Sequence, residues 1–166
     1  MKNVIAAIFG VLCLVVGVQA QSDNETLRIN AQVDSRFKIE ISANAVTFTR
    51  TVDPSTNPVI VQNEPPIQIR VKATRAGNQR VYLRIRAVAD LSDGYGHTIS
   101  VGNVTWQATG TGYTSNGTLV RNSSLQLGYW AESGDYSGTL TFRFQDNPNY
   151  YPGVYSVTVT LTVSPN

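Results

Sequence analysis

The sequence predicts an all-β fold, and three observations carry that prediction. Apolar side chains recur with a period of two, as in antiparallel strands with one buried face, and not at the i, i+3, i+4 spacing of a helix. Turn-forming Asp-Pro, Asp-Gly and Asn-Gly dipeptides separate these runs. Val, Thr, Ser, Asn and Gly are abundant, which suits sheets with one solvated face. Such strands form a sandwich or a barrel, and we expect an antiparallel β-sandwich of about 8–10 short strands.

The N-terminal segment has the pattern of a secretory signal peptide. Lys2 precedes an apolar run over residues 4–18, and residues 18–20 read Val-Gln-Ala, with small residues where signal peptidase reads. The alternative, a transmembrane anchor, needs about 20 apolar residues, and this run is shorter. We therefore expect a signal peptide over residues 1–20, export of the protein, and one domain over residues 21–166 with no membrane span.

Cys13 is the only cysteine, and it lies inside this leader. Lipid attachment there would require small residues before it, whereas Val11 and Leu12 are bulky. The mature chain then has no cysteine, which excludes disulfides, thiol catalysis and cysteine-based metal sites. Lys and Arg total 13 and Asp and Glu total 11, a net charge of +2, whereas a nucleic-acid-binding domain would be strongly basic. We expect no nucleic-acid partner, no metal and no cofactor.

The alternating runs follow one another in order along the chain. The first, at 27–33, starts close behind the leader, and a second follows the Asp34-Ser35 break at 37–41. The later runs alternate Ile, Val, Leu, Ala, Tyr or Phe with Gln, Arg, Lys, Ser or Thr, at 67–73, 81–89, 125–127, 140–144 and 155–163. Turns are expected where Gly, Pro, Asn and Asp gather, at 51–58, 63–66, 93–94, 109–118 and 146–153.

The two longest central runs predict a hairpin around Ala76-Gly77-Asn78. Both runs must turn their apolar side chains to the same face, which requires an odd-numbered loop with a left-handed residue at Gly77 or Asn78. In that register Arg70 lies opposite Arg84, an unfavourable pairing of like charges. The hairpin then presents a basic stripe made of Arg70, Lys72, Arg84 and Arg86. The stripe is either a docking face for an acidic partner, such as a neighbouring copy, or a solvated face that uses the long arginine stems.

Three other groups of residues are candidate sites. Exposed aromatic rings would suit sugar stacking, although large aromatics are by default core residues; the candidates are Trp130, Tyr150 and Tyr151, with Tyr129 and Tyr136 nearby. Asp90 and Asp93 fit a calcium loop or a turn stabilised by Asp side chains. His97 has no Gly-x-Ser-x-Gly elbow beside it, so we expect a loop residue and no catalytic site. Glycosylation sequons begin at Asn24, Asn103, Asn116 and Asn122.

The strand over 27–33 is unusual because it is strongly alternating and follows a short polar stretch at 21–25. Its apolar face carries Leu27, Ile29, Ala31 and Val33. Such a strand must be buried, since an exposed apolar edge is an aggregation hazard. It is either the first strand of its own sandwich or a strand added to a neighbouring subunit.

Both ends of the domain resemble a chaperone–usher pilin subunit of the cysteine-free colonisation-factor type, and more loosely a spore coat protein U domain. The matching segments are Leu27-Arg-Ile-Asn-Ala-Gln-Val-Asp34 and Pro152-Gly-Val-Tyr-Ser-Val-Thr-Val-Thr-Leu-Thr-Val163. The resemblance implies an incomplete immunoglobulin-like sandwich, whose groove is filled by a periplasmic chaperone and then by a neighbour's N-terminal strand. It implies donor side chains at Leu27, Ile29, Ala31 and Val33, and a strand bordering the groove with Val157, Val159, Leu161 and Val163.

The function expected on this basis is structural. The chain would be an exported fimbrial subunit, in the periplasm, on the cell surface or outside the cell, that polymerises by donor-strand exchange. The alternative is a monomeric secreted β-sandwich that binds a carbohydrate or another surface ligand through loops and aromatics. An enzyme is not expected, because no acid/base or metal constellation is visible in the sequence.

Overall fold

The structure, a computed structural model, describes residues 28, 30, 34–50, 56 and 58–165. The predicted all-β fold is confirmed: the described residues form eleven strands and one 3-10 turn, η1 (Val101–Asn103). The strands are β1 (Arg36–Ile41), β2 (Val59–Val61), β3 (Ile67–Thr74), β4 (Val81–Ala87), β5 (Leu91–Ser92), β6 (Thr98–Ile99), β7 (Val104–Thr109), β8 (Asn116–Thr118), β9 (Ser124–Trp130), β10 (Gly134–Gln145) and β11 (Val159–Pro165). The count exceeds the expected one because several strands are only two or three residues long.

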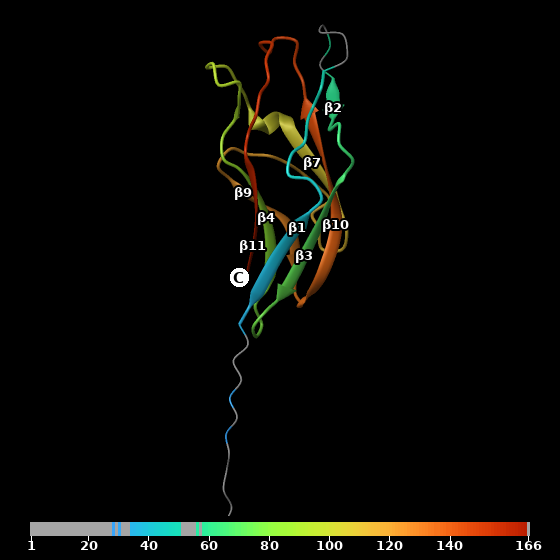
Figure 1. Ribbon diagram of the computed structural model, residues 1–166, viewed down its shortest axis with the longest axis vertical. Coiled ribbons are helices and arrows are strands. Elements are labelled where there is room, and N and C mark those ends of the chain that lie inside the picture. Colours follow the sequence, from blue (N-terminus) through green and yellow to red (C-terminus); the bar gives the residue numbers. More distant parts are fainter. Residues whose placement is uncertain (1–27, 29, 31–33, 51–55, 57, 166) are drawn as a thin grey trace, which may run out of the picture. The chain divides into compact units, whose positions relative to one another are not determined.

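Two antiparallel sheets build the sandwich (Figure 1). The first has the order β1-β3-β10-β7-β8, with β2 also paired to β10, and the second has the order β11-β4-β9. In the immunoglobulin constant-type arrangement, one sheet holds strands A, B, E and D and the other holds C, F and G. Here β1, β3, β10 and β7 take the positions of A, B, E and D, and β4 and β11 take those of C and F. No described residue occupies the position of strand G beside β11.

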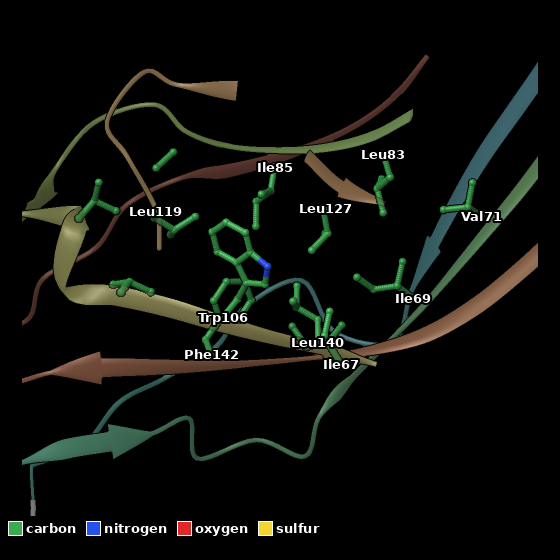
Figure 2. Close-up of a cluster of buried hydrophobic side chains, with 14 of the residues drawn as sticks. Ile67, Ile69, Val71, Leu83, Ile85, Trp106, Leu119, Leu127, Leu140 and Phe142 are labelled. Carbon is green, nitrogen blue, oxygen red and sulfur yellow. The ribbon is translucent and has the colours of Figure 1, made fainter. Parts of the chain in front are cut away.

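The core lies between the two sheets and follows the predicted alternation. In β3 the residues Ile67, Ile69 and Val71 are buried while the residues between them are partly or fully exposed. Leu83 and Ile85 of β4 are fully buried in the same way. Figure 2 shows Ile85, Leu119, Leu127 and Phe142 around the indole of Trp106, with Leu83, Ile69 and Val71 further along the same core. A period of two in the sequence therefore identified the buried face of each of these strands correctly.

The predicted hairpin between the two central runs is wrong. β3 pairs with β1 and β10, whereas β4 pairs with β11 and β9, so the connection crosses from one sheet to the other. Arg75 holds this crossing together, because its Nη1 donates to the carbonyl oxygens of Gly77 at 2.8 Å and Gln79 at 2.9 Å. Gly77 has a positive φ of 59°, as expected for the left-handed residue of the loop. Arg70 and Arg84 consequently belong to different sheets.

A buried glutamine joins the two strands that share one side of β10. β2 pairs with the C-terminal part of β10 and β3 with its N-terminal part, and Gln62 lies between them. Its side-chain oxygen accepts from the backbone N–H of Phe142 at 2.7 Å. Its side-chain nitrogen donates to the carbonyl oxygens of Glu64 at 3.1 Å and Pro65 at 2.9 Å. The side chain thus supplies the hydrogen bonds that the interrupted strand does not.

Candidate functional site

The candidate site is the outer edge of β11, where the sandwich is open. β11 pairs with β4 from Val159 opposite Ala87 to Pro165 opposite Val81, and no described residue pairs with its other edge. The inward-facing residues of β4 are fully buried, but those of β11 are only half-buried although they pack against the core. These half-buried residues are Val159, Leu161 and Val163. The apolar face of β11 is therefore incompletely covered.

Strand β1, the edge of the other sheet, borders the same opening. Cα atoms of β1 and β11 come within 8 Å of each other. Phe37 and Ile39 of β1 are half-buried against the core, and Ile41 is 45% exposed. We call these two neighbouring edges, with Phe37, Ile39, Ile41, Val159, Leu161 and Val163, the β1/β11 edge. It offers main-chain hydrogen-bonding groups from β11 and apolar side chains from both sheets.

The opposite edge of the second sheet is covered by the chain itself. Beside β9, the backbone N–H of Thr114 donates to the carbonyl oxygen of Leu127 at 2.9 Å, and the N–H of Tyr129 donates to that of Gly112 at 2.8 Å. Tyr113 and Gly128 form an antiparallel bridge there. β9 is thus shielded, whereas β11 is not shielded by any residue within the described ranges.

The predicted donor side chains, Leu27, Ile29, Ala31 and Val33, lie outside the described residues, as does the predicted signal peptide. Their role stays a prediction. Of the residues predicted on the bordering strand, Val159, Leu161 and Val163 lie on β11, and Val157 lies just before it, half-buried against the core. The structure therefore places the acceptor side of the predicted pairing at a sheet edge.

The predicted basic stripe is divided between the two sheets because β3 and β4 do not pair. On the first sheet, Nε of Arg70 donates to Asp135 at 2.7 Å, and Lys72 lies 3.3 Å from Glu40. The hydrogen bond from Arg70 holds the pKa of Asp135 below its ordinary value. Hydrogen bonds from Lys38 and Lys72 likewise lower the pKa of Glu40. This half of the stripe is neutralised, and only Arg84 and Arg86 of β4 remain as a basic feature.

The predicted ligand aromatics do not form one platform. Trp130 is only 5% exposed, because its ring stacks on Tyr136 at 4.6 Å and its Nε1 donates to the Thr111 carbonyl oxygen at 2.8 Å. A buried ring offers no face to a sugar, so this prediction is wrong for Trp130. The Tyr150 hydroxyl accepts a hydrogen bond from Asn103 at 2.8 Å, and that ring is half-buried. Tyr151 is exposed and stacks on His97.

The predicted Asp loop is a turn closed on itself. Oδ1 of Asp93 accepts from the backbone N–H groups of Tyr95 at 2.8 Å and His97 at 3.1 Å, and Oδ2 lies 2.6 Å from Nδ1 of His97. Burial opposes the ionisation of Asp93, but these hydrogen bonds outweigh it and hold the pKa of Asp93 below its ordinary value. Within the described residues, no three His, Cys, Asp or Glu side chains gather in a way that could hold a metal ion.

The chain matches no protein-family model, and no curated protein matches it. Among the described residues, no helix is both long and apolar enough to cross a membrane. The geometric feature that most needs an explanation is the unpaired, half-covered edge of β11.

Proposed function

We propose that the chain is an exported structural subunit of a fimbrium-like polymer, in which the N-terminal strand of one copy pairs with β11 of the next. The observation that carries the proposal is the β1/β11 edge, where the position of strand G is empty of described residues. The resemblance of both ends of the domain to pilin subunits supports the same hypothesis of polymerisation by donor-strand exchange. The partners it implies are further copies of the chain and, before assembly, a chaperone that covers this edge.

The residues at 27–33 would supply the apolar side chains and the backbone pairing that the β1/β11 edge lacks. They alternate apolar side chains with Arg28, Asn30 and Gln32, so one face would complete the core and the other would face solvent. Burial of a large apolar side chain contributes about 1.5–3 kcal/mol, so the four side chains of this face would contribute several kcal/mol. Backbone pairing with β11 would add to this, as in other cases of strand addition.

A neighbour's strand fits the edge better than the chain's own. Residue 33 and Arg36, the first residue of β1, are separated only by Asp34 and Ser35. β1 belongs to the first sheet and β11 to the second, so a self-pairing strand would have to change sheets between residue 33 and Arg36. An extended residue spans at most about 3.3–3.6 Å, so Asp34 and Ser35 would have to carry the chain directly from one sheet to the other, with no residues left for a loop.

The test compares Ile29→Asp with Asn30→Asp in the purified chain. Both variants add one negative charge to the same segment, but only the first places it on the apolar face. We expect the parent and Asn30→Asp to form polymers that survive cold detergent and collapse to one band on boiling, and Ile29→Asp to form none. Size-exclusion chromatography with light scattering gives the mass of each species.

Two results would contradict the proposal. Polymers of Ile29→Asp equal to those of the parent would remove the donor role of the 27–33 segment. A parent chain that is a stable monomer at all concentrations would also end the polymer hypothesis. It would favour the alternative, a monomeric secreted binding module.

A further inference from the structure

The outer face of the second sheet carries arginines that form no ion pair with a carboxylate of the described residues. Arg84 and Arg86 lie on the solvent side of β4, and Arg80 lies just before the strand. None of the ion pairs formed by described residues involves these three arginines. On the other sheet, by contrast, Arg70 pairs with Asp135. The two faces of the sandwich therefore differ in their electrostatic character.

Tyrosine rings hold two of these arginines in place. The guanidinium carbon of Arg84 lies 5.4 Å from the ring centre of Tyr82, and that of Arg80 lies 5.8 Å from the ring centre of Tyr129. The two rings lie 5.2 Å apart at an angle of 54° on neighbouring strands. Cation–π contacts of this kind orient the guanidinium groups before a ligand arrives, which lowers the entropic cost of binding. We call Arg80, Tyr82, Arg84, Arg86 and Tyr129 the arginine–tyrosine face.

Hydroxyl and amide groups surround the arginine–tyrosine face. On β11 the residues opposite Arg86, Arg84 and Tyr82 are Thr160, Thr162 and Ser164. On β9, Gln126 lies opposite Arg84, and Ser124 lies opposite Arg86. The large exposed apolar side chains of the described residues lie outside β4, β9 and β11, although Val88 directly follows β4. The face therefore combines cations, aromatic rings and hydroxyl groups, with one exposed valine beyond its end.

We propose that this face docks an anionic polysaccharide. The planar guanidinium fork binds a carboxylate or a sulfate with two parallel hydrogen bonds, and the tyrosine rings beneath Arg80 and Arg84 hold these forks on the surface. Arg84 and Arg86 are alternate residues of one strand, so their stems are about 7 Å apart on the same face. Two guanidinium groups at this spacing can bind successive anionic groups of a repeating chain. The hydroxyl groups of β11 and β9 would hydrogen-bond the sugar hydroxyls.

Other polyanionic partners fit the face less well. A lipid surface would call for several apolar side chains that insert below the headgroups, whereas the five residues of the face include no aliphatic side chain and only Val88 follows directly after β4. A nucleic acid would call for a strongly basic domain, whereas the chain has a net charge of +2. The proposal does not depend on polymerisation, because it rests on the outward side chains of the sheet and not on the edge of β11.

The experiment measures binding of the purified chain to two anionic probes, heparin and polygalacturonate, with neutral dextran as the reference. The test variant is Arg84→Gln combined with Arg86→Gln. The matched control is Arg36→Gln combined with Arg143→Gln, which removes two exposed arginines from the first sheet. We expect the parent to bind at least one anionic probe, with an affinity that falls as salt rises, and not to bind dextran.

The variants should distinguish binding at the arginine–tyrosine face from non-specific attraction of the probe to the positive charge of the chain. We expect the Arg84/Arg86 variant to lose about tenfold in affinity for each arginine, since charge-assisted hydrogen bonds are stronger than neutral ones, and the control to stay within about twofold. Tyr82→Phe, which keeps the ring, should bind like the parent, whereas Tyr82→Leu should weaken binding about two- to fivefold. Near-ultraviolet circular dichroism confirms that each variant is folded.

Three results would overturn the proposal. Equal losses in the test and control variants would show that binding follows total charge and not this face. Absence of binding to both anionic probes would exclude an anionic polysaccharide. Tighter binding to phosphatidylglycerol vesicles than to either polysaccharide would assign the face to a membrane. The same measurements on Ile29→Asp keep this result separate from the outcome of the polymerisation test.

Discussion

Replacement of Gln62 by leucine tests how the interrupted strand is held to β10. The substitution keeps the size and apolar stem of the side chain but removes its three hydrogen bonds, to Phe142, Glu64 and Pro65. Gln62 is only 6% exposed, and its bond to the Phe142 N–H is buried, so water cannot replace that partner. An unsatisfied buried group costs about 1–3 kcal/mol. The bonds to the Glu64 and Pro65 carbonyl groups are only part-buried, so their loss adds less, and we expect a total loss of about 2–4 kcal/mol.

The assay is equilibrium unfolding in urea, followed by the fluorescence of the two tryptophans. Gln68→Leu is the control, because Gln68 is exposed on the outer face of β3 and an exposed change typically alters stability by less than about 0.5 kcal/mol. Both variants are compared with the parent in the same assembly state. The comparison requires that the slope of the unfolding free energy against urea concentration is the same for all three proteins. Amide exchange at Phe142 should be slow in the parent and fast in Gln62→Leu. A loss below about 1 kcal/mol with Phe142 still protected would refute the role assigned to Gln62.

Two further predictions concern a glycine and an ion pair. Gly112→Ala should destabilise the chain by about 2 kcal/mol more than Gly94→Ala in thermal or urea unfolding. Both glycines have a positive φ, but only at position 112 would the new Cβ meet a side chain, that of Trp130; equal losses would contradict the clash. The hydrogen bond from Arg70 lowers the pKa of Asp135. The stability that this ion pair contributes is therefore fully present above the ordinary carboxyl pKa and is lost as the pH falls through the lowered value. Asp135→Asn should flatten the decline in stability below about pH 4 in acid titrations, and an unchanged decline would show that the pair contributes nothing.

The alternation of side chains predicted the buried face of each strand but not the sheet to which it belongs. Val71 and Leu83 face the same core whether their strands pair in a hairpin or face each other from opposite sheets. Both arrangements satisfy the same parity, so the sequence could not decide between them. The difference lies in the partners that each strand takes, since β3 pairs with β1 and β10 whereas β4 pairs with β11 and β9. The loop is held partly by bonds from Arg75 to residues close in sequence and partly by the distant Ser35 hydroxyl, which bonds Ala76 and Gln79. Pairing between strands far apart in sequence leaves no local pattern.

The candidate sites were predicted with uneven success for a related reason. The residues of the predicted basic stripe do point outward, but Asp135 of β10 and Glu40 of β1 neutralise Arg70 and Lys72. The sequence alone does not bring these carboxylates beside β3. The arginine–tyrosine face was not predicted because its residues are distant in sequence: Tyr129 lies on β9, and its partner Arg80 directly precedes β4. A signal was available in the sequence, since the outward residues of β4, β9 and β11 include no carboxylate. That signal becomes readable only once the order of strands is known.

The residues of β11 are those of a central strand, although the described residues leave it at an edge. Natural edge strands are protected by charged side chains, prolines or bulges. β1, the other strand of the β1/β11 edge, follows that rule with Arg36, Lys38 and Glu40 on its outward face. β11 has no charged residue along its length, and its only such device is Pro165 at the end. An uncharged Val-Thr-Leu-Thr-Val strand at an edge is an aggregation hazard unless another strand regularly covers it. This mismatch between sequence and position is what a strand donated by a neighbouring copy would resolve.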